Sequence, residues 1–371
     1  LLSLIPSYGR WDDLFIFSNK KVIKAVVEIV IKSLEDSNTS SLLAKWLPIN
    51  NVKGNERVFL SYLRKALGKT PKEYRQYIVS KRNVIETLMC QGKWDEIDYS
   101  KVPSVAMSML KKAFQTHDEE GFEQYVNSLV KGETKVNANT LYPYQIISTF
   151  KKGNLYDNYF SDETLIALAD EQWKALPNFL PNEPLNILPV VDVSGSMTTS
   201  VSRNTTALDV ALSLGMYISE RNKGDFKDVY CTFSSTPTLG VLKGENLYER
   251  VLRLSKSYWG MSTDLLKTLQ LIVDFGKKNE VKNEDMPKAL LIISDMNFDA
   301  SQMFLSQGSS TQVVKYEDII AQSLGRKIFE EAGYSYPTII YWNVNHNGGF
   351  TAKSNDAGVM MVSGFSPSIC T

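Results

Sequence analysis

Three oxygen-bearing side chains at alternate positions follow an apolar run in the second half of the chain. Asp192, Ser194 and Ser196 form the pattern D-x-S-x-S directly after Ile187–Val191. Alternate spacing in a loop that leaves a strand turns a carboxylate and two hydroxyls toward one point, and Gly195 permits the tight bend. Hard oxygen ligands with one strong charge suit Mg²⁺ or Mn²⁺, which keep water in an octahedral shell. Alone the motif is weak, because Asp and Ser are common in turns.

Two other apolar segments adjoin residues that can complete such a shell. Thr263 precedes an expected helix, and the expected strand Lys288–Ser294 runs directly into Asp295. In open parallel sheets, ligands bind at the carboxyl ends of the strands. The sequence therefore predicts one divalent-metal site built from Asp192, Ser194, Ser196, Thr263 and Asp295. Nearby, Asp264 is interpreted as a helix-start charge and Asp299 as a loop carboxylate.

The sequence motifs of several other enzyme classes are broken at specific positions of this chain. The pattern G-x-S-x-G needs a glycine where Asp192 stands, and a D-x-D phosphatase needs a second Asp where Ser194 stands. No P-loop or dinucleotide fingerprint is present. The two histidines, His117 and His346, fall in a solvated helix junction and in a turn cluster. Since no general base or nucleophile adjoins the predicted ligands, we expect the protein not to be an enzyme.

The pattern of elements changes near the middle of the chain. Residues 1–176 read as all-α, with apolar residues at helical spacing in Val22–Ser33, Glu56–Leu67, Lys72–Gln91, Ser104–Gln115 and Glu119–Val130. Thr70, Pro71 and Glu73 form a helix-start signal. Several prolines then predict a linker over 177–186.

Residues 187–371 alternate apolar strands with helices, which predicts an α/β domain with a doubly wound, mostly parallel sheet. The expected elements are strand Asn186–Val193, helix Thr206–Arg221, strand Asp228–Phe233, strand Thr238–Leu242, helix Asn246–Leu254, helix Asp264–Lys277, strand Lys288–Ser294, helix Glu317–Ala332, strand Thr338–Val344 and strand Val359–Val362.

Composition narrows the setting. No run reaches the roughly 18 apolar residues that span a bilayer, so we expect no membrane insertion. The cysteines Cys90, Cys231 and Cys370 are far apart and odd in number, which indicates a reducing, intracellular and thus cytoplasmic location. The chain begins at Leu1 without a methionine, and its original termini are expected to lie beyond it.

The net charge of +0 hides a segregation of charge. Residues 1–152 carry 23 Lys+Arg against 16 Asp+Glu, and residues 153–371 carry 18 against 25. Between Lys45 and Arg82 there are 10 basic residues and 2 acidic ones, interleaved with aromatic rings. Cations for phosphates and rings for unstacked bases are what single-stranded RNA requires, although such faces are more often only solvated. The candidate RNA-binding residues are Arg57, Arg64, Lys65, Lys69, Lys72, Arg75, Lys81 and Arg82.

Two resemblances bear on these halves. D-x-S-x-S, then T-D, then a strand-terminal Asp resembles the metal-ion-dependent adhesion site of von Willebrand A domains, over about 180 residues. The stretch 5–14 (IPSYGRWDDL) resembles a motif of the TROVE module of the Ro autoantigen and its relatives, where a helical repeat domain binds RNA and precedes a von Willebrand A domain. The stretches 44–48 (AKWLP), 70–75 (TPKEYR) and 94–104 (WDEIDYSKVPS) look more like an uncharacterised TROVE-related family of plants and large viruses. That resemblance implies the architecture and assigns no activity.

Two functions remain open from the sequence. The first is a non-catalytic RNA-binding scaffold whose metal captures an acidic side chain or a phosphate. The alternative is a metal-dependent protein–protein interaction module without RNA binding. Which RNA or protein is bound, and the oligomeric state, do not follow from the sequence.

Overall fold

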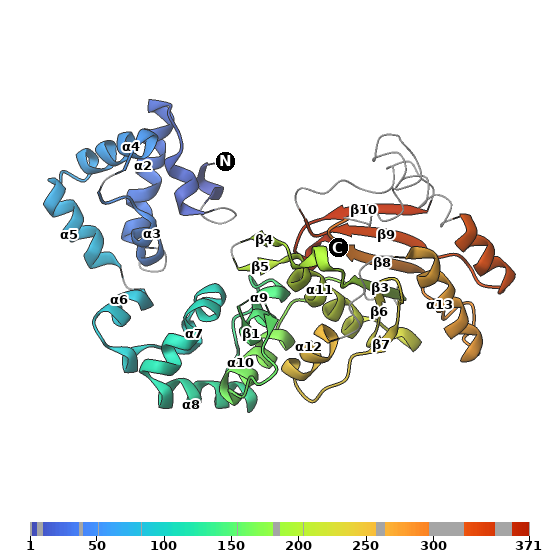
Figure 1. Ribbon diagram of the computed structural model, residues 1–371. Helices are drawn as coiled ribbons and strands as arrows, with labels where there is room; N and C mark the ends of the chain where they lie inside the picture. Colours follow the sequence, from blue (N-terminus) through green and yellow to red (C-terminus); the bar gives the residue numbers. More distant parts are fainter. Residues whose placement is uncertain are drawn as a thin grey trace. The chain divides into compact units, whose positions relative to one another are not determined.

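The computed structural model describes residues 2–5, 10–36, 40–50, 52–82, 84–153, 155–180, 186–202, 204–256, 264–296, 323–345 and 358–370. The chain divides into two compact units, Leu1–Tyr99 and Ser100–Thr371 (Figure 1). Each unit has its own buried core, and each is described by itself.

The first unit is helical. Its longest helix begins after Asn19, whose side chain accepts a hydrogen bond from the Lys21 amide at 2.9 Å. This helix buries Val26, Val30 and Leu34, which recur every four residues and so share one face. The helices are α2 (Lys20–Glu35), α3 (Ser40–Trp46), α4 (Gly54–Ala66), α5 (Pro71–Lys81) and α6 (Ile85–Cys90), with 3-10 turns η1 (Leu2–Leu4), η2 (Trp11–Phe15), η3 (Trp94–Glu96) and η4 (Tyr99–Lys101).

The start of α5 confirms the predicted capping signal, whereas its end differs from the prediction. The Glu73 amide donates to Thr70 Oγ1 at 3.3 Å, and the Thr70 amide donates to the Glu73 carboxylate at 2.8 Å. The single helix expected over Lys72–Gln91 is wrong, because α5 ends at Lys81 and α6 begins at Ile85. Arg82 is extended, and its Nε donates to the carbonyl of Ala44 at 2.7 Å, a tertiary contact that ends the helix.

The second unit opens with further helices and a short hairpin. Its helices before the sheet are α7 (Ser104–His117), α8 (Glu119–Val130), α9 (Pro143–Ile147) and α10 (Glu163–Lys174), with η5 (Ser148–Phe150) after α9. Strands β1 (Lys151–Lys152) and β2 (Leu155–Tyr156) pair antiparallel. The front half is therefore helical but not all-α as predicted. The hairpin forms because Lys151 and Tyr156 both reach Asp209 on a distant helix.

Six strands form the central sheet of the second unit, in the order β10-β9-β8-β3-β6-β7. The strands are β3 (Ile187–Asp192), β6 (Val229–Phe233), β7 (Leu239–Val241), β8 (Ala289–Ser294), β9 (Thr338–Asn343) and β10 (Val359–Ser363). All neighbouring pairs are parallel except β6 and β7. The second unit is thus of the α/β class, with a mixed sheet in which four of the five neighbouring pairs are parallel. Pro189 lies inside β3, and the pairing of β3 with β6 begins at Val190, so the missing amide of Pro189 lies outside that ladder.

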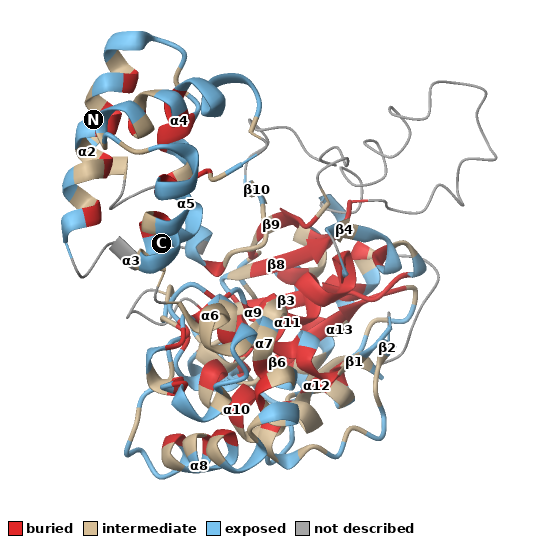
Figure 2. Cartoon of the chain, turned by 90° about the vertical axis from the view of Figure 1, so that its left-hand side faces the viewer, coloured by how far each residue is buried: buried red, intermediate tan, exposed pale blue. Residues whose placement is uncertain are grey.

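Helices cover both faces of this sheet, which explains why its strands are continuous apolar runs. On one face, Val191, Ile293 and Trp342 pack with α9, α10, α11 (Ala207–Arg221) and α12 (Leu247–Ser255). On the other face, Val190 and Ile292 pack with α13 (Leu265–Lys278) and with residues 323–331, which are helical. In Figure 2 the strands β3, β6, β8 and β9 and the helix α11 form the buried centre of this unit. Two short strands, β4 (Ser200–Ser202) and β5 (Thr205–Thr206), pair just before α11.

The compact division at Tyr99 and Ser100 differs from the boundary predicted at 177–186. Residues after Ser100 pack directly on the sheet's own helices: Trp173 Nε1 donates to Glu220 at 2.6 Å, and the Tyr217 hydroxyl donates to the Pro177 carbonyl at 2.5 Å. The helices α9 and α10 therefore share a core with the α/β domain. Among the helices that the structure describes, none has the length and apolar character to cross a membrane.

Candidate functional site

Four of the five predicted metal ligands lie at the carboxyl edge of the mostly parallel sheet, namely Asp192, Ser194, Ser196 and Asp295. β3 lies between β8 and β6, and its residues Val191 and Asp192 pair with Ile293 of β8 and Phe233 of β6. The chain places β6 on one side of β3 and β8 on the other, so the strand order reverses here. Such a switch point is where open α/β sheets bind ligands. Parallel pairing brings Asp192 next to the segment that holds Asp295.

Four of the five predicted ligands form one continuous chain of polar contacts. The Ser194 amide donates to Asp192 Oδ1 at 2.9 Å, which folds the loop back on the strand end. The hydroxyls of Ser194 and Ser196 are 3.0 Å apart. The Ser196 hydroxyl donates to Asp295 Oδ1 at 3.3 Å. The hydroxyls of Ser194 and Ser196 thus lie together beside Asp295, and the turn is closed by η6 (Gly195–Thr198).

Both carboxylates of this cluster are fully buried. Asp192 and Asp295 each have 0% of their surface exposed. Burial raises the pKa of Asp192 to about 6, against the lowering effect of hydrogen bonds from Ser294 and Ser194. No lysine or arginine of the described residues pairs with Asp192. A buried carboxylate without a counter-charge is costly, and a bound cation is one way to offset that cost.

The donor set fits a small, hard cation. At the metal–oxygen distances of Mg²⁺, adjacent octahedral ligands are about 2.9 Å apart, close to the 3.0 Å between the Ser194 and Ser196 hydroxyls. Within the described part of the chain, no group of three His, Cys, Asp or Glu residues gathers to hold a metal. The cluster therefore offers hydroxyls and carboxylates and lacks the nitrogen and sulfur ligands that zinc favours.

The remaining site predictions divide by position. Thr263, His346 and Asp299 lie outside the described residues. Asp264 is described and caps α13: its carboxylate accepts from the Lys267 amide at 3.0 Å and pairs with the Lys267 ammonium at 3.3 Å. That agrees with its interpretation as a helix-start charge.

Two further serines of this edge belong to no sequence motif, so the sequence patterns do not predict them. The Ser294 hydroxyl donates to Asp192 Oδ2 at 2.5 Å and accepts from the Met296 amide at 3.0 Å. Ser234, one residue beyond β6, is fully buried, and its hydroxyl has no partner among the described residues. Each of these serines stands at the last position of a buried strand or directly after it. This pattern points to the site only when the order of the strands in the sheet is known.

The predicted basic residues lie on α4, on α5, on the segment that joins them and at the position directly after α5. Arg57, Lys65, Lys72 and Arg75 are exposed, whereas Arg64, Lys69, Lys81 and Arg82 are partly buried. No carboxylate of the described residues forms an ion pair with any of the eight. We call these eight residues the basic surface of the first unit (the exposed faces of α4 and α5 are visible in Figure 2). Arg82 also serves the fold through its bond to the Ala44 carbonyl.

The aromatic residues near the basic surface divide into core and surface rings. Phe59 and Tyr74 are buried, and the Tyr74 hydroxyl donates to the Pro48 carbonyl at 3.1 Å. Tyr77 is partly exposed and lies between two cations, with the ammonium of Lys69 at 4.8 Å and that of Lys81 at 5.8 Å from its ring centre. Tyr77 is therefore the partly exposed ring of the basic surface, and the ammonium groups of Lys69 and Lys81 lie near it.

Fold and site together define an α/β protein with a preceding helical unit and a polar cluster at the switch point of its sheet. The family described as "Domain of unknown function (DUF7788)" matches residues 186–371, half of the chain. A second, described as "Domain of unknown function (DUF2828)", matches residues 50–182. The chain belongs to the DUF7788 family.

One relative and one solved structure are similar to this chain over most of its length. The "Uncharacterized protein L728" of Acanthamoeba polyphaga mimivirus is 28% identical over 410 residues, covering 98% of this chain and 67% of the relative. A solved structure, the "Crystal structure of Deinococcus radiodurans RO (RSR) protein", is similar at a TM-score of 0.39 and 12% identity, covering 99% of this chain and 71% of that chain.

Proposed function

We propose that this protein is a non-catalytic RNA-binding scaffold whose α/β domain, doubly wound and of the von Willebrand A type, holds Mg²⁺ or Mn²⁺ in an adhesion-type site. The metal-binding part of this proposal is supported by the continuous contacts from buried Asp192 through Ser194 and Ser196 to Asp295. Asp192, Ser194, Ser196 and Asp295 would hold the ion together with Thr263. Bound there, the ion would supply an open coordination position for an acidic side chain or a phosphate.

The helical first unit, in this proposal TROVE-like, supplies the RNA contact. Its basic surface combines cations that no described carboxylate neutralises with the ring of Tyr77 between Lys69 and Lys81. Glu73, which is adjacent to Lys72 in sequence, is occupied by the cap of α5. A surface of this kind attracts backbone phosphates and offers a ring for stacking.

We propose binding without catalysis because the groups at the sheet edge are already engaged. Both oxygens of Asp192 accept hydrogen bonds, one from the Ser194 amide and one from the Ser294 hydroxyl. The two loop hydroxyls contact each other, and the Ser196 hydroxyl also contacts Asp295. A reducing compartment fits this proposal, since Cys90 and Cys231 are both free thiols.

The metal half is tested by thermal unfolding of the full chain with and without Mg²⁺ or Mn²⁺. A ligand that binds only the folded state stabilises it by about 2.7 kcal/mol at a hundredfold excess over its dissociation constant. We expect the melting temperature to rise for the wild type and to stay unchanged for Asp192→Ala. The matched control is Asp225→Ala, an exposed carboxylate of the same unit, which should keep the full rise. A rise that persists in Asp192→Ala would place the ion elsewhere.

The RNA half is tested by the salt dependence of binding to a labelled single-stranded oligonucleotide. If about four phosphates are neutralised, log affinity falls against log salt with a slope of about −3. A slope near zero would remove RNA as the ligand of the basic surface.

The alternative, a metal-dependent protein–protein interaction module, is favoured by the same buried carboxylates and needs no RNA. It predicts that a captured protein partner survives nuclease treatment but is released by a chelator. Release by nuclease and retention with chelator would favour the RNA scaffold instead.

A further inference from the structure

A pocket of about 320 Å³ opens in the second unit beside the loop that carries Ser196. Three segments far apart in sequence line it: the β2 strand and the turn after it, the segment from η6 to the start of α11, and the end of α12. Its volume falls at the lower end of the range for small-molecule sites. The lining residues are Leu155, Tyr156, Asn158, Thr198, Thr206, Leu208, Ser255 and Lys256.

The walls of this pocket are fixed from behind by buried polar contacts. The Tyr156 hydroxyl donates to Asp209 Oδ1 at 3.0 Å, and the Lys151 ammonium pairs with Oδ2 of the same carboxylate at 2.6 Å. Asp209 also accepts from the Thr206 amide at 2.8 Å in the cap of α11. The hairpin and the helix start are thereby joined through one carboxylate.

The third wall is tied to the hairpin as well. The Tyr248 hydroxyl of α12 donates to the Asp157 carbonyl at 2.8 Å and accepts from the Phe160 amide at 3.2 Å. The rings of Phe160 and Tyr248 are 5.8 Å apart, and each lies 5.4 Å from the ring of Phe150. All three walls are thus held in place without a ligand, and side chains still leave the space between them open. Preformed walls of this kind lower the entropic cost of binding.

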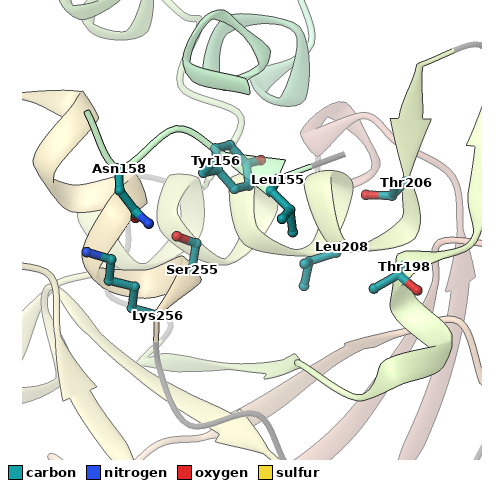
Figure 3. Close-up of a pocket in the computed structure, with 8 residues that line it drawn as sticks. All are labelled: Leu155, Tyr156, Asn158, Thr198, Thr206, Leu208, Ser255 and Lys256. Carbon is teal, nitrogen blue, oxygen red and sulfur yellow. The ribbon is translucent and has the colours of Figure 1, made fainter. Parts of the chain in front are cut away.

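The lining groups are arranged with polar ends and an apolar middle. In Figure 3, Asn158, Ser255 and Lys256 gather at one end, Thr198 and Thr206 at the other, and Leu155 and Leu208 point into the space between. Leu155 is 70% exposed although it is apolar. A ligand with an apolar or flat body and hydrogen-bonding edges would cover that side chain.

The charge of the pocket selects an anion. Lys256 is exposed and, among the described residues, forms no ion pair, and no acidic side chain belongs to the described lining. Asp209, the carboxylate behind the wall, is already neutralised by Lys151. One unpaired ammonium beside an amide and a hydroxyl suits a phosphate group.

We propose that this pocket binds a single nucleotide, with its phosphate at Lys256 and its base between Leu155 and Leu208. A lone Asp or Glu side chain would leave most of the 320 Å³ unfilled and the leucines uncovered. The inference goes beyond the proposed function, since it needs neither the metal nor the basic surface. The nucleotide is either free or part of an RNA chain, and both share the base and phosphate that the lining matches.

The test is calorimetric titration of the full chain with AMP and UMP in the presence of a chelator. We expect saturable binding at one site, weakened at least about tenfold by Lys256→Gln, which removes a charge-assisted hydrogen bond. Leu155→Trp, at an exposed position that tolerates substitution, should weaken binding by a similar factor because the larger ring fills the space. Lys227→Gln, an exposed lysine of the same unit, is the matched control and should leave binding unchanged.

The outcomes separate cleanly. Undiminished binding in both Lys256→Gln and Leu155→Trp would overturn the pocket, and so would the lack of any binding by the wild type. Equal affinity for N-acetylglutamate would overturn the nucleotide in favour of an acidic peptide. Displacement of AMP by a short oligonucleotide assigns the site to RNA, and failure to displace it assigns a free nucleotide; both agree with the proposed ligand class. Because chelator is present, loss of the metal response in Asp192→Ala does not affect this result.

Discussion

The hydroxyl of Ser294, at the end of β8, donates a hydrogen bond to Asp192 Oδ2 at 2.5 Å. Asp192 ends β3, the strand that pairs in parallel with β8. The same hydroxyl accepts from the Met296 amide at 3.0 Å. One serine therefore positions the carboxylate of the first strand and the turn that follows the second. Asp295 lies between Ser294 and Met296 in the sequence. The positions of both carboxylates, those of Asp192 and Asp295, therefore depend on Ser294.

Removal of this hydroxyl should weaken both the fold and the metal response. Ser294→Ala leaves one buried oxygen of Asp192 without a donor, and we expect a loss of about 1–3 kcal/mol in the free energy of unfolding. Groups that orient a metal ligand typically change metal affinity 10- to 100-fold, so the Mg²⁺ concentration that gives half of the thermal shift should rise by about that factor. Urea unfolding and Mg²⁺-dependent melting measure the two effects.

The matched control for Ser294→Ala is Ser200→Ala, an exposed serine of the same unit, for which we expect a change within about 0.5 kcal/mol. An equal, small effect of both substitutions would show that the Ser294 contact does not support Asp192.

Lys111 predicts a pH dependence of stability. Its side chain is buried and donates to Thr149 Oγ1 at 2.6 Å, and burial lowers the pKa of Lys111 from 10.5 to about 8. Between pH 8 and 10.5 the unfolded chain then binds more protons at this residue than the folded chain, so stability rises with pH across this window. The full contribution of the shift is about 3 kcal/mol.

Lys111→Met should remove that part of the pH dependence and stabilise the protein at pH 7, since a buried charge without a carboxylate partner is replaced by an apolar group of similar length. Thr149 keeps its own hydrogen bond to the Ile146 carbonyl at 2.6 Å. The measurement is the difference between the unfolding free energies of wild type and variant from pH 7 to pH 10.5. A constant difference across that range would contradict the shift.

The buried ion pair of Lys151 and Asp209 predicts a large, partner-dependent cost. The two side chains have 6% and 3% of their surface exposed. Lys151→Met leaves a buried carboxylate unpaired, and we expect a loss of about 3–5 kcal/mol. The double variant Lys151→Met/Asp209→Asn should lose less than the sum of the two single changes, as denaturant unfolding can show. Strict additivity would mean that the two groups do not interact.

The basic surface predicts different effects for its exposed and its structural members. Lys72→Gln and Arg75→Gln remove exposed charges that make no ion pair, so each should lower the salt slope of RNA binding by about 0.7 if it contacts one phosphate. Unfolding free energy should change little in both. Arg82→Gln should instead destabilise the unit by about 0.5–1.5 kcal/mol, since its Nε bonds to the Ala44 carbonyl.

Lys32→Gln, on the exposed side of α2 in the same unit, is the control for these charge removals. If it lowers the salt slope as much as Lys72→Gln does, binding follows net charge and the basic surface has no special role.

Local patterns in the chain were enough to place most elements and the first part of the site. Thr70, Pro71 and Glu73 predicted the start of α5, because capping involves residues only three apart. The apolar runs that became β3 and β8 were continuous because both of their faces are covered. Asp192, Ser194 and Ser196 lie within five residues, so their spacing alone indicated a shared direction.

Packing between distant residues decided the rest. Ser294 lies 102 residues from Asp192, Asp209 lies 58 residues from Lys151, and Ala44 lies 38 residues from Arg82. The hairpin of β1 and β2, the end of α5 and the division of the units at Tyr99 all follow from such contacts. Periodicity and turn chemistry describe how each segment prefers to fold. Which buried polar group meets which partner depends on strand order and helix packing, which are properties of the whole core.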